Sequence, residues 1–128
     1  MVFHVTALYA SILAIAGIVL SIIVSTKRGK YAVSIGDGGH PELALWIRKQ
    51  GNFCEYVPLA ILMMALAEAD GMPAPWLHVI GVLLLVSRLI HVLGLKADKP
   101  TEPLRIIGTV GTHLSILGAA IFLLWSLY

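Results

Sequence analysis

Residues 5–25 of the chain read VTALYASILAIAGIVLSIIVS, an apolar stretch without a charged side chain. A helix needs roughly 20 apolar residues to cross the hydrocarbon core of a bilayer, so this stretch predicts a membrane-spanning helix. It lacks the short apolar run and small-residue cleavage site of a signal peptide, and we expect it to remain as an anchor. The basic residues Lys27, Arg28 and Lys30 mark its end.

Three further apolar segments follow this first one. The second begins at Pro41, which suits the first turn of a helix because no N–H is needed there, and it is apolar throughout residues 57–67. The third runs from Trp76 to about Leu95, and the fourth from Leu104 to about Trp125. The segments between them carry the glycine, proline and charged residues of loops; they are residues 31–40, 68–75 and 96–103. We therefore predict an all-α membrane four-helix bundle, with residues 1–128 forming a single domain.

The overall composition agrees with four spans. Hydrophobic residues make up 59% of the 128 residues and charged residues only 12%, with a mean hydropathy of +0.91. A soluble domain has about 25% charged residues, so most of this surface must face something other than water. A net charge of +2 is too small for nucleic-acid binding. The one cysteine, Cys54, cannot form an internal disulfide, and the isolated histidines His4, His78 and His113 predict no metal site.

The basic residues predict the orientation. They cluster around the first loop (Lys27, Arg28, Lys30, Arg48 and Lys49) and the third loop (Lys96, Lys99 and Arg105), whereas the second loop has only Glu68 and Asp70. Basic loops stay in the cytoplasm, so we expect both termini outside. Trp76, Trp125 and Tyr128 then fall at the outer interface, where amphipathic rings settle.

Polar residues at the start of the second span need a reason, because ionisable groups inside a membrane are costly. At 100° per residue, Arg48, Asn52 and Glu55 lie in a narrow stripe on one helix face, flanked by Tyr56. A stripe of cation, amide and carboxylate suits a small zwitterionic ligand. The structural alternative is an ion pair of Glu55 with Arg88 or Arg48 that pins helices together.

Two other spans contribute candidate residues. Arg88 and His91 lie three residues apart near the cytoplasmic end of the third span, and Arg88 is the expected partner of Glu55. The ring of His91 can hydrogen-bond either to a ligand or to a neighbouring backbone carbonyl. Arg105 opens the fourth span, where an arginine either reaches lipid headgroups or lowers the pKa of a thiol.

The segment Arg48–Leu59, RKQGNFCEYVPL, resembles the signature of the MAPEG family, the membrane-associated proteins of eicosanoid and glutathione metabolism. Residues 35–41, IGDGGHP, resemble the bacterial branch of that family. Arg88 and His91 on the third span and Pro103-Leu104-Arg105 before the fourth are similar to the family pattern in the same order. The resemblance therefore covers nearly the whole chain and implies a bacterial inner membrane protein.

The resemblance implies a homotrimer that binds glutathione as co-substrate between neighbouring subunits. Arg48, Asn52, Glu55 and Tyr56 would hold glutathione from one subunit, with Arg88 and His91 as further glutathione-binding residues, while Arg28 and Gln50 approach from the next. Arg105 would be the catalytic residue that stabilises the thiolate, which attacks a lipophilic electrophile or a hydroperoxide from the bilayer. His91 and Leu95 stand where leukotriene C synthase has tyrosines that touch glutathione, and Ile106 stands where prostaglandin synthases have a serine.

Two other functions remain as alternatives. A non-catalytic lipid-binding member of the same family would not need Arg105 together with Arg48, Asn52 and Glu55. A small four-span drug exporter would use a carboxylate in its first span, and residues 5–25 contain none. Neither the second substrate nor the identity of the thiol follows from the sequence.

Overall fold

Four helices build the computed structural model, which describes residues 3–96, 98–99 and 102–127. They are α1 (His4–Tyr31), α2 (Pro41–Ala69), α3 (Ala74–Gly94) and α4 (Pro103–Ser126). Each is long enough and apolar enough to cross a membrane, which confirms the predicted all-α, four-span architecture. α1 continues past its apolar stretch through the basic residues to Tyr31. Part of the predicted loop at 96–103, and Tyr128, lie outside the described residues.

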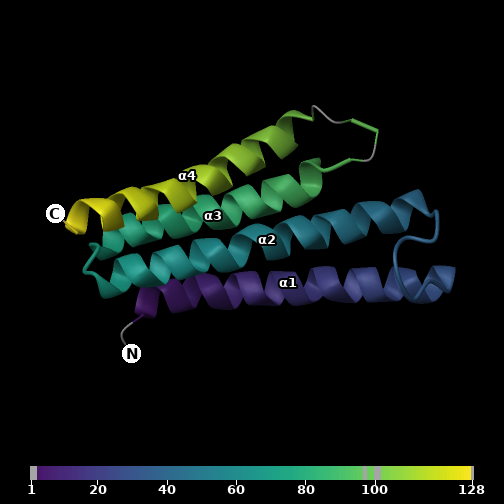
Figure 1. Ribbon diagram of the computed structural model, residues 1–128, viewed down its shortest axis with the longest axis horizontal. Helices are drawn as coiled ribbons and strands as arrows, with labels where there is room; N and C mark the ends of the chain where they lie inside the picture. Colours follow the sequence, from purple (N-terminus) through teal and green to yellow (C-terminus); the bar gives the residue numbers. More distant parts are fainter. Residues whose placement is uncertain (1–2, 97, 100–101, 128) are drawn as a thin grey trace.

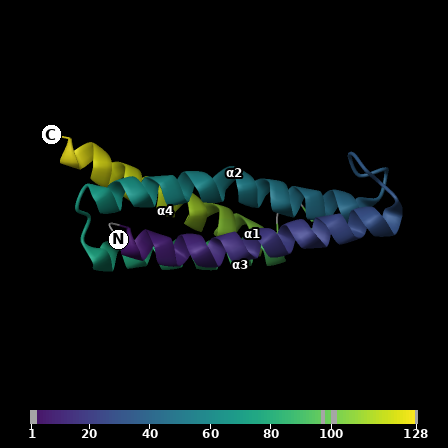
Figure 2. The same ribbon diagram turned by 90° about the horizontal axis from the view of Figure 1, so that it is seen from below.

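The helices run alternately up and down (Figure 1). Both ends of the chain lie at the same end of the bundle as the connection between α2 and α3, and the loop between α1 and α2 lies at the other end (Figures 1 and 2). There α1 and α2 extend beyond α3 and α4. The most extensive helix contacts are between α3 and α4 and between α1 and α2.

Helix starts follow simple rules in this chain. Proline occupies the first turn of α2, α3 and α4, where its missing N–H leaves no hydrogen bond unmade. α1 is held differently, because the carboxylate of Glu68 accepts hydrogen bonds from the backbone N–H groups of Val5 (2.9 Å) and Thr6 (2.8 Å). A carboxylate at a helix N-terminus satisfies free N–H groups and complements the helix dipole. Glu68, predicted as a loop residue, instead lies in α2 and joins its C-terminal end to the N-terminal end of α1.

Apolar side chains fill the bundle and also cover its outside. Leu13, Met64 and Leu84 are fully buried between the helices, whereas Ile15 and Ile121 are exposed on the described chain. Such large exposed apolar residues occur on all four helices. An apolar exterior of this kind is suited to lipid and to other membrane helices rather than to water.

Small residues let α3 and α4 approach closely. A Cβ atom added to Gly108 would lie 2.6 Å from the backbone nitrogen of His91 and 2.7 Å from the carbonyl oxygen of Ser87. A Cβ atom added to Gly111 would lie 2.1 Å from Ser87 Oγ. Glycine therefore sets the spacing of these two helices, which carry Arg88 and Arg105.

We expect Gly108→Ala to lower the free energy of unfolding by about 1–3 kcal/mol, the cost of overpacking a tight contact. The new methyl group meets backbone atoms of α3, which cannot move away without separating the helices. Thermal denaturation in mild detergent measures the change. Gly118→Ala is the matched control on the same helix, because its Cβ would meet Ile80 at an ordinary 3.7 Å. Equal stability of the two variants would contradict this account of the α3–α4 contact.

Exposed positions in two loops allow a test of the predicted orientation. Ser34, in the loop after α1, and Asp70, after α2, are both exposed. With Cys54 replaced by alanine, a cysteine at position 70 should react with a membrane-impermeant maleimide in cells with a permeabilised outer membrane. A cysteine at position 34 should react only after the inner membrane is opened, because the basic first loop stays in the cytoplasm. The opposite labelling pattern would reverse the orientation.

Candidate functional site

An ion pair lies on the outer surface of α2. Both terminal guanidinium nitrogens of Arg48 donate to the carboxylate of Glu55, at 3.0 and 3.1 Å. The side chains remain 59% and 51% exposed, although Glu55 is the middle residue of the Pro41–Ala69 helix. Charged groups at such depth ordinarily face a protein interior, a cavity or a partner. This surface of α2 is therefore the strongest candidate for a site where a ligand or another subunit binds.

Asn52 takes part in a second, buried polar contact. The guanidinium of Arg88, 2% exposed, donates to Asn52 Oδ1 at 2.8 Å and to the Gly108 carbonyl oxygen at 3.2 Å. It also lies 5.7 Å from the centre of the Tyr56 ring. Arg88 thus ties α2 to α4 and fixes the orientation of the Asn52 amide.

The predicted ion pair between Arg88 and Glu55 is wrong, and the alternative pair with Arg48 is the one observed. Asn52 and Glu55 are three residues apart, so their side chains differ by about 60° around the helix. Asn52 is turned inward to meet Arg88, and Glu55 is turned outward along the surface to meet Arg48. Sequence spacing placed all three side chains in one stripe but did not show which edge of the stripe faces the interior.

His91 and Arg105 lie where α3 ends and α4 begins. His91 is 3% exposed and packs against Gly108. Arg105 is partly buried one turn before Gly108, and a Cβ on Gly94 would meet its backbone nitrogen at 2.4 Å. With Ile106, Thr109 and Val110, Arg105 lines a hollow of about 190 Å³ on α4. Arg105 therefore stands at the same end of the bundle as Arg48, one turn of α4 before Gly108, whose carbonyl oxygen accepts from Arg88.

Two predicted binding residues lie elsewhere in the subunit. Arg28 donates to the carbonyl oxygens of Ser34 (3.3 Å) and Gly36 (2.8 Å) and so shapes the first loop. Gln50 lines a groove between α1 and α2 together with the exposed Cys54. Their approach to the site from a neighbouring subunit stays a prediction.

His113 is isolated in the sequence, but its ring centre lies 5.3 Å from that of Tyr56. This contact connects the polar surface of α2 with α4. Arg105, Thr109 and His113 recur every four residues, a spacing that places them on one face of α4. In the sequence, this four-residue spacing was the signal that groups His113 with Arg105.

The chain is similar to known proteins over most of its length. Residues 6–125 match the MAPEG family. Inner membrane protein YecN of Escherichia coli strain K12 is 41% identical over 90 residues, which cover 70% of this chain and 69% of YecN. YecN of Escherichia coli O6:H1 strain CFT073 matches with the same identity and coverage.

Proposed function

The chain is a multi-pass bacterial inner membrane protein that belongs to the MAPEG family, and on this basis we propose that it is a glutathione transferase or peroxidase. In this proposal the protein binds glutathione, holds its sulfur as thiolate and directs it at a lipophilic substrate dissolved in the bilayer. The observation that carries the proposal is the exposed ion pair of Arg48 with Glu55, the middle residue of α2.

Glutathione has the charges that this surface requires. It carries two carboxylates and one ammonium group, so Arg48 would bind a carboxylate and Glu55 the ammonium through charge-assisted hydrogen bonds. Asn52 is already oriented by Arg88, and Tyr56 lies beside it. Arg88 would thus position Asn52, while the charged contacts to the tripeptide come from Arg48 and Glu55.

We also propose that the protein is a homotrimer whose subunits cover this face of α2. A lone subunit would leave the Arg48–Glu55 pair against lipid, at a cost of several kcal/mol. A neighbouring subunit would bring Arg28 and Gln50 to the bound tripeptide. Light scattering in mild detergent should give three copies per particle. A monomer that still binds glutathione would rule out a site between subunits.

Arg105 would supply the chemical step. Its guanidinium, placed near the bound sulfur, would lower the thiol pKa from about 8.5 and favour the thiolate at neutral pH. The thiolate sulfur then attacks an electrophilic carbon, a C–S bond forms, and the leaving group departs with the bonding electron pair. With a hydroperoxide, sulfur takes the terminal oxygen and releases the alcohol, and a second glutathione then displaces water to give the disulfide.

Glutathione-dependent conjugation of a generic aromatic halide by the detergent-purified protein tests the proposal. Calorimetry with glutathione, and with S-methylglutathione as a non-reacting ligand, measures binding separately. Binding with turnover above the uncatalysed rate is the expected result. Binding without turnover on halides or hydroperoxides would favour the non-catalytic alternative, and no binding at all would overturn the proposed site.

A further inference from the structure

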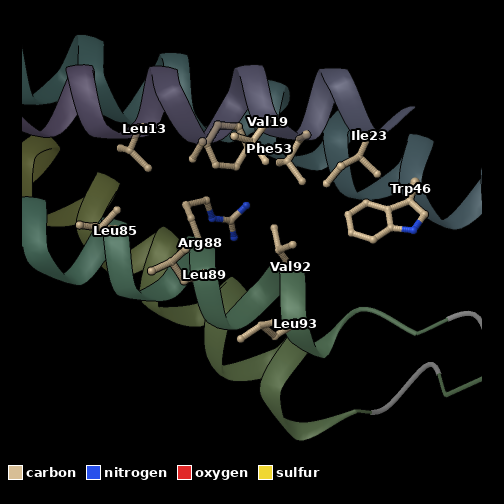
Figure 3. A pocket seen from close by; sticks show the side chains of 12 residues that line it. Leu13, Val19, Ile23, Trp46, Phe53, Leu85, Arg88, Leu89, Val92 and Leu93 are labelled. Carbon is tan, nitrogen blue, oxygen red and sulfur yellow. The ribbon is translucent and has the colours of Figure 1, made fainter. Parts of the chain in front are cut away.

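Two lysines and a tryptophan meet at the end of the bundle where α1 and α2 extend beyond α3 and α4. The ammonium groups of Lys27 on α1 and Lys49 on α2 lie over the indole ring of Trp46, 5.8 and 4.6 Å from its centre. All three side chains are partly buried. Figure 3 shows Trp46 at one end of the row of labelled residues, with its indole nitrogen turned away from the others. We call these three residues the Trp46 cluster.

The positive charge of the Trp46 cluster exceeds the negative charge beside it. In the described part of the chain, the carboxylate that pairs with the cluster is that of Glu42, and it is shared between Lys27 and Lys30. The side chain of Lys49 makes no ion pair or hydrogen bond with another described residue, and its ammonium rests on the indole ring alone. Two ammonium groups beside one ring repel each other, so an anion bound between them would be stabilised.

We propose that the Trp46 cluster binds the phosphate headgroup of an anionic phospholipid. Two lysines from different helices would hold the phosphate oxygens through charge-assisted hydrogen bonds, and the indole N–H of Trp46 would add a neutral donor. Basic side chains and tryptophan are the groups that contact lipid headgroups at a membrane surface. The fatty chains would stay in the surrounding bilayer.

The position of the cluster along the helices favours a lipid over a soluble phosphate. Lys27 follows the apolar residues 5–25 by two positions, and Lys49 precedes the apolar residues 57–67 by about two helical turns. Both lysines thus lie where the hydrocarbon ends and lipid phosphates are concentrated. A zwitterionic lipid brings its own cation to the site, so a lipid with net negative charge should bind better. The proposal goes beyond the proposed function, because it requires neither glutathione nor a second subunit.

The three tryptophans allow a direct test, because Trp76 and Trp125 lie at the opposite end of the bundle from Trp46. One variant, Trp76→Phe with Trp125→Phe, reports on the cluster, and Trp46→Phe reports on the opposite end. Each protein is placed in phosphatidylcholine vesicles that contain increasing fractions of phosphatidylglycerol brominated close to the headgroup, a heavy-atom quencher of tryptophan. Phosphatidylcholine with the same brominated chains is the reference lipid.

We expect brominated phosphatidylglycerol to quench Trp46 at mole fractions about fivefold lower than brominated phosphatidylcholine does, the scale of one unpaired lysine at a lipid surface. The other two tryptophans should show no such preference. In the Trp46 reporter, Lys49→Gln should remove most of the preference and Lys49→Arg should retain it. Lys96→Gln is the matched control, because Lys96 lies at the same end of the bundle but already pairs with Glu102.

Several results would contradict the proposal. Equal quenching of Trp46 by the two lipids, or an unchanged preference in Lys49→Gln, would overturn it. An equal loss of preference in Lys96→Gln would show a general attraction to the basic surface and would overturn the assignment to the Trp46 cluster.

A last titration separates a lipid from a soluble phosphate. Inorganic phosphate is added to the vesicles, with sodium chloride at the same ionic strength as the reference, and we expect the two salts to weaken the preference equally. If phosphate removes the preference and chloride does not, the choice of a lipid headgroup is overturned. Glutathione turnover is not part of this readout, so this proposal and the proposed function fail independently.

Discussion

Replacing Glu55 with glutamine is expected to weaken glutathione binding by about 2–5 kcal/mol, the range for breaking a desolvated charge pair. The substitution keeps the shape of the side chain and removes the charge that would pair with the ligand ammonium. In the free subunit both oxygens of Glu55 accept from Arg48. The ligand would divide this pair, its ammonium taking Glu55 and its carboxylate taking Arg48. Calorimetry on the purified protein measures the loss, which corresponds to about 30-fold or more in Kd.

Glu42→Gln is the matched control for this experiment. Glu42 is an exposed carboxylate on the same helix, and it pairs with Lys27 and Lys30 beside the first loop. Its replacement should leave glutathione binding unchanged. If Glu55→Gln lowers thermal stability while glutathione binding stays the same, the ion pair is structural and Glu55 does not bind glutathione.

The spans could be predicted from the sequence because the membrane imposes a simple length rule. Roughly 20 apolar residues cross the hydrocarbon, and residues 5–25 meet that rule without a charge. Proline gave the start of α2 for an equally local reason, since its ring cannot donate a hydrogen bond. Hydropathy does not give the true helix ends, because α1 continues for six residues beyond residue 25, through the basic residues Lys27, Arg28 and Lys30 to Tyr31.

Partners across helices could not be predicted in the same way. Periodicity states which residues share a face, but the depth and rotation of one helix against the next depend on packing. Arg88 reaches the Gly108 carbonyl oxygen because Gly108 lets α3 and α4 approach closely. Glu68 caps α1 for a similar reason, since the up-and-down arrangement brings the end of α2 beside the start of α1. Neither contact has a local sequence signal.

Arg105→Ala is expected to lower glutathione turnover by about 10² or more, the scale for losing one preorganised electrostatic group. Binding of the tripeptide should change much less, because Arg48, Asn52 and Glu55 would still hold it. Turnover and calorimetric affinity, measured on the same preparation, separate these two effects.

The thiol itself provides a second readout of Arg105. Thiolate absorbs in the ultraviolet and thiol does not, so the spectrum of bound glutathione reports its ionisation. In Arg105→Ala the thiol pKa should rise toward its free value of about 8.5, and the thiolate signal at neutral pH should fall. The variant should regain thiolate, and part of its turnover, as the pH is raised.

Two substitutions decide between a catalytic and a lipid-anchoring Arg105. Arg105→Lys should restore only part of the turnover, because an ammonium lacks the planar fork and reach of a guanidinium, whereas a residue that only contacts headgroups would tolerate lysine. Lys96→Ala removes an exposed cation, paired with Glu102 at the same end of the bundle, and should leave the thiolate signal intact.

If Arg105→Ala retains full turnover, Arg105 is not catalytic, and its partly buried position beside Gly94 serves the packing of α4 on α3. If turnover and thiolate fall together in Arg105→Ala and remain in Lys96→Ala, the loss is specific to this guanidinium rather than to positive charge at the membrane surface.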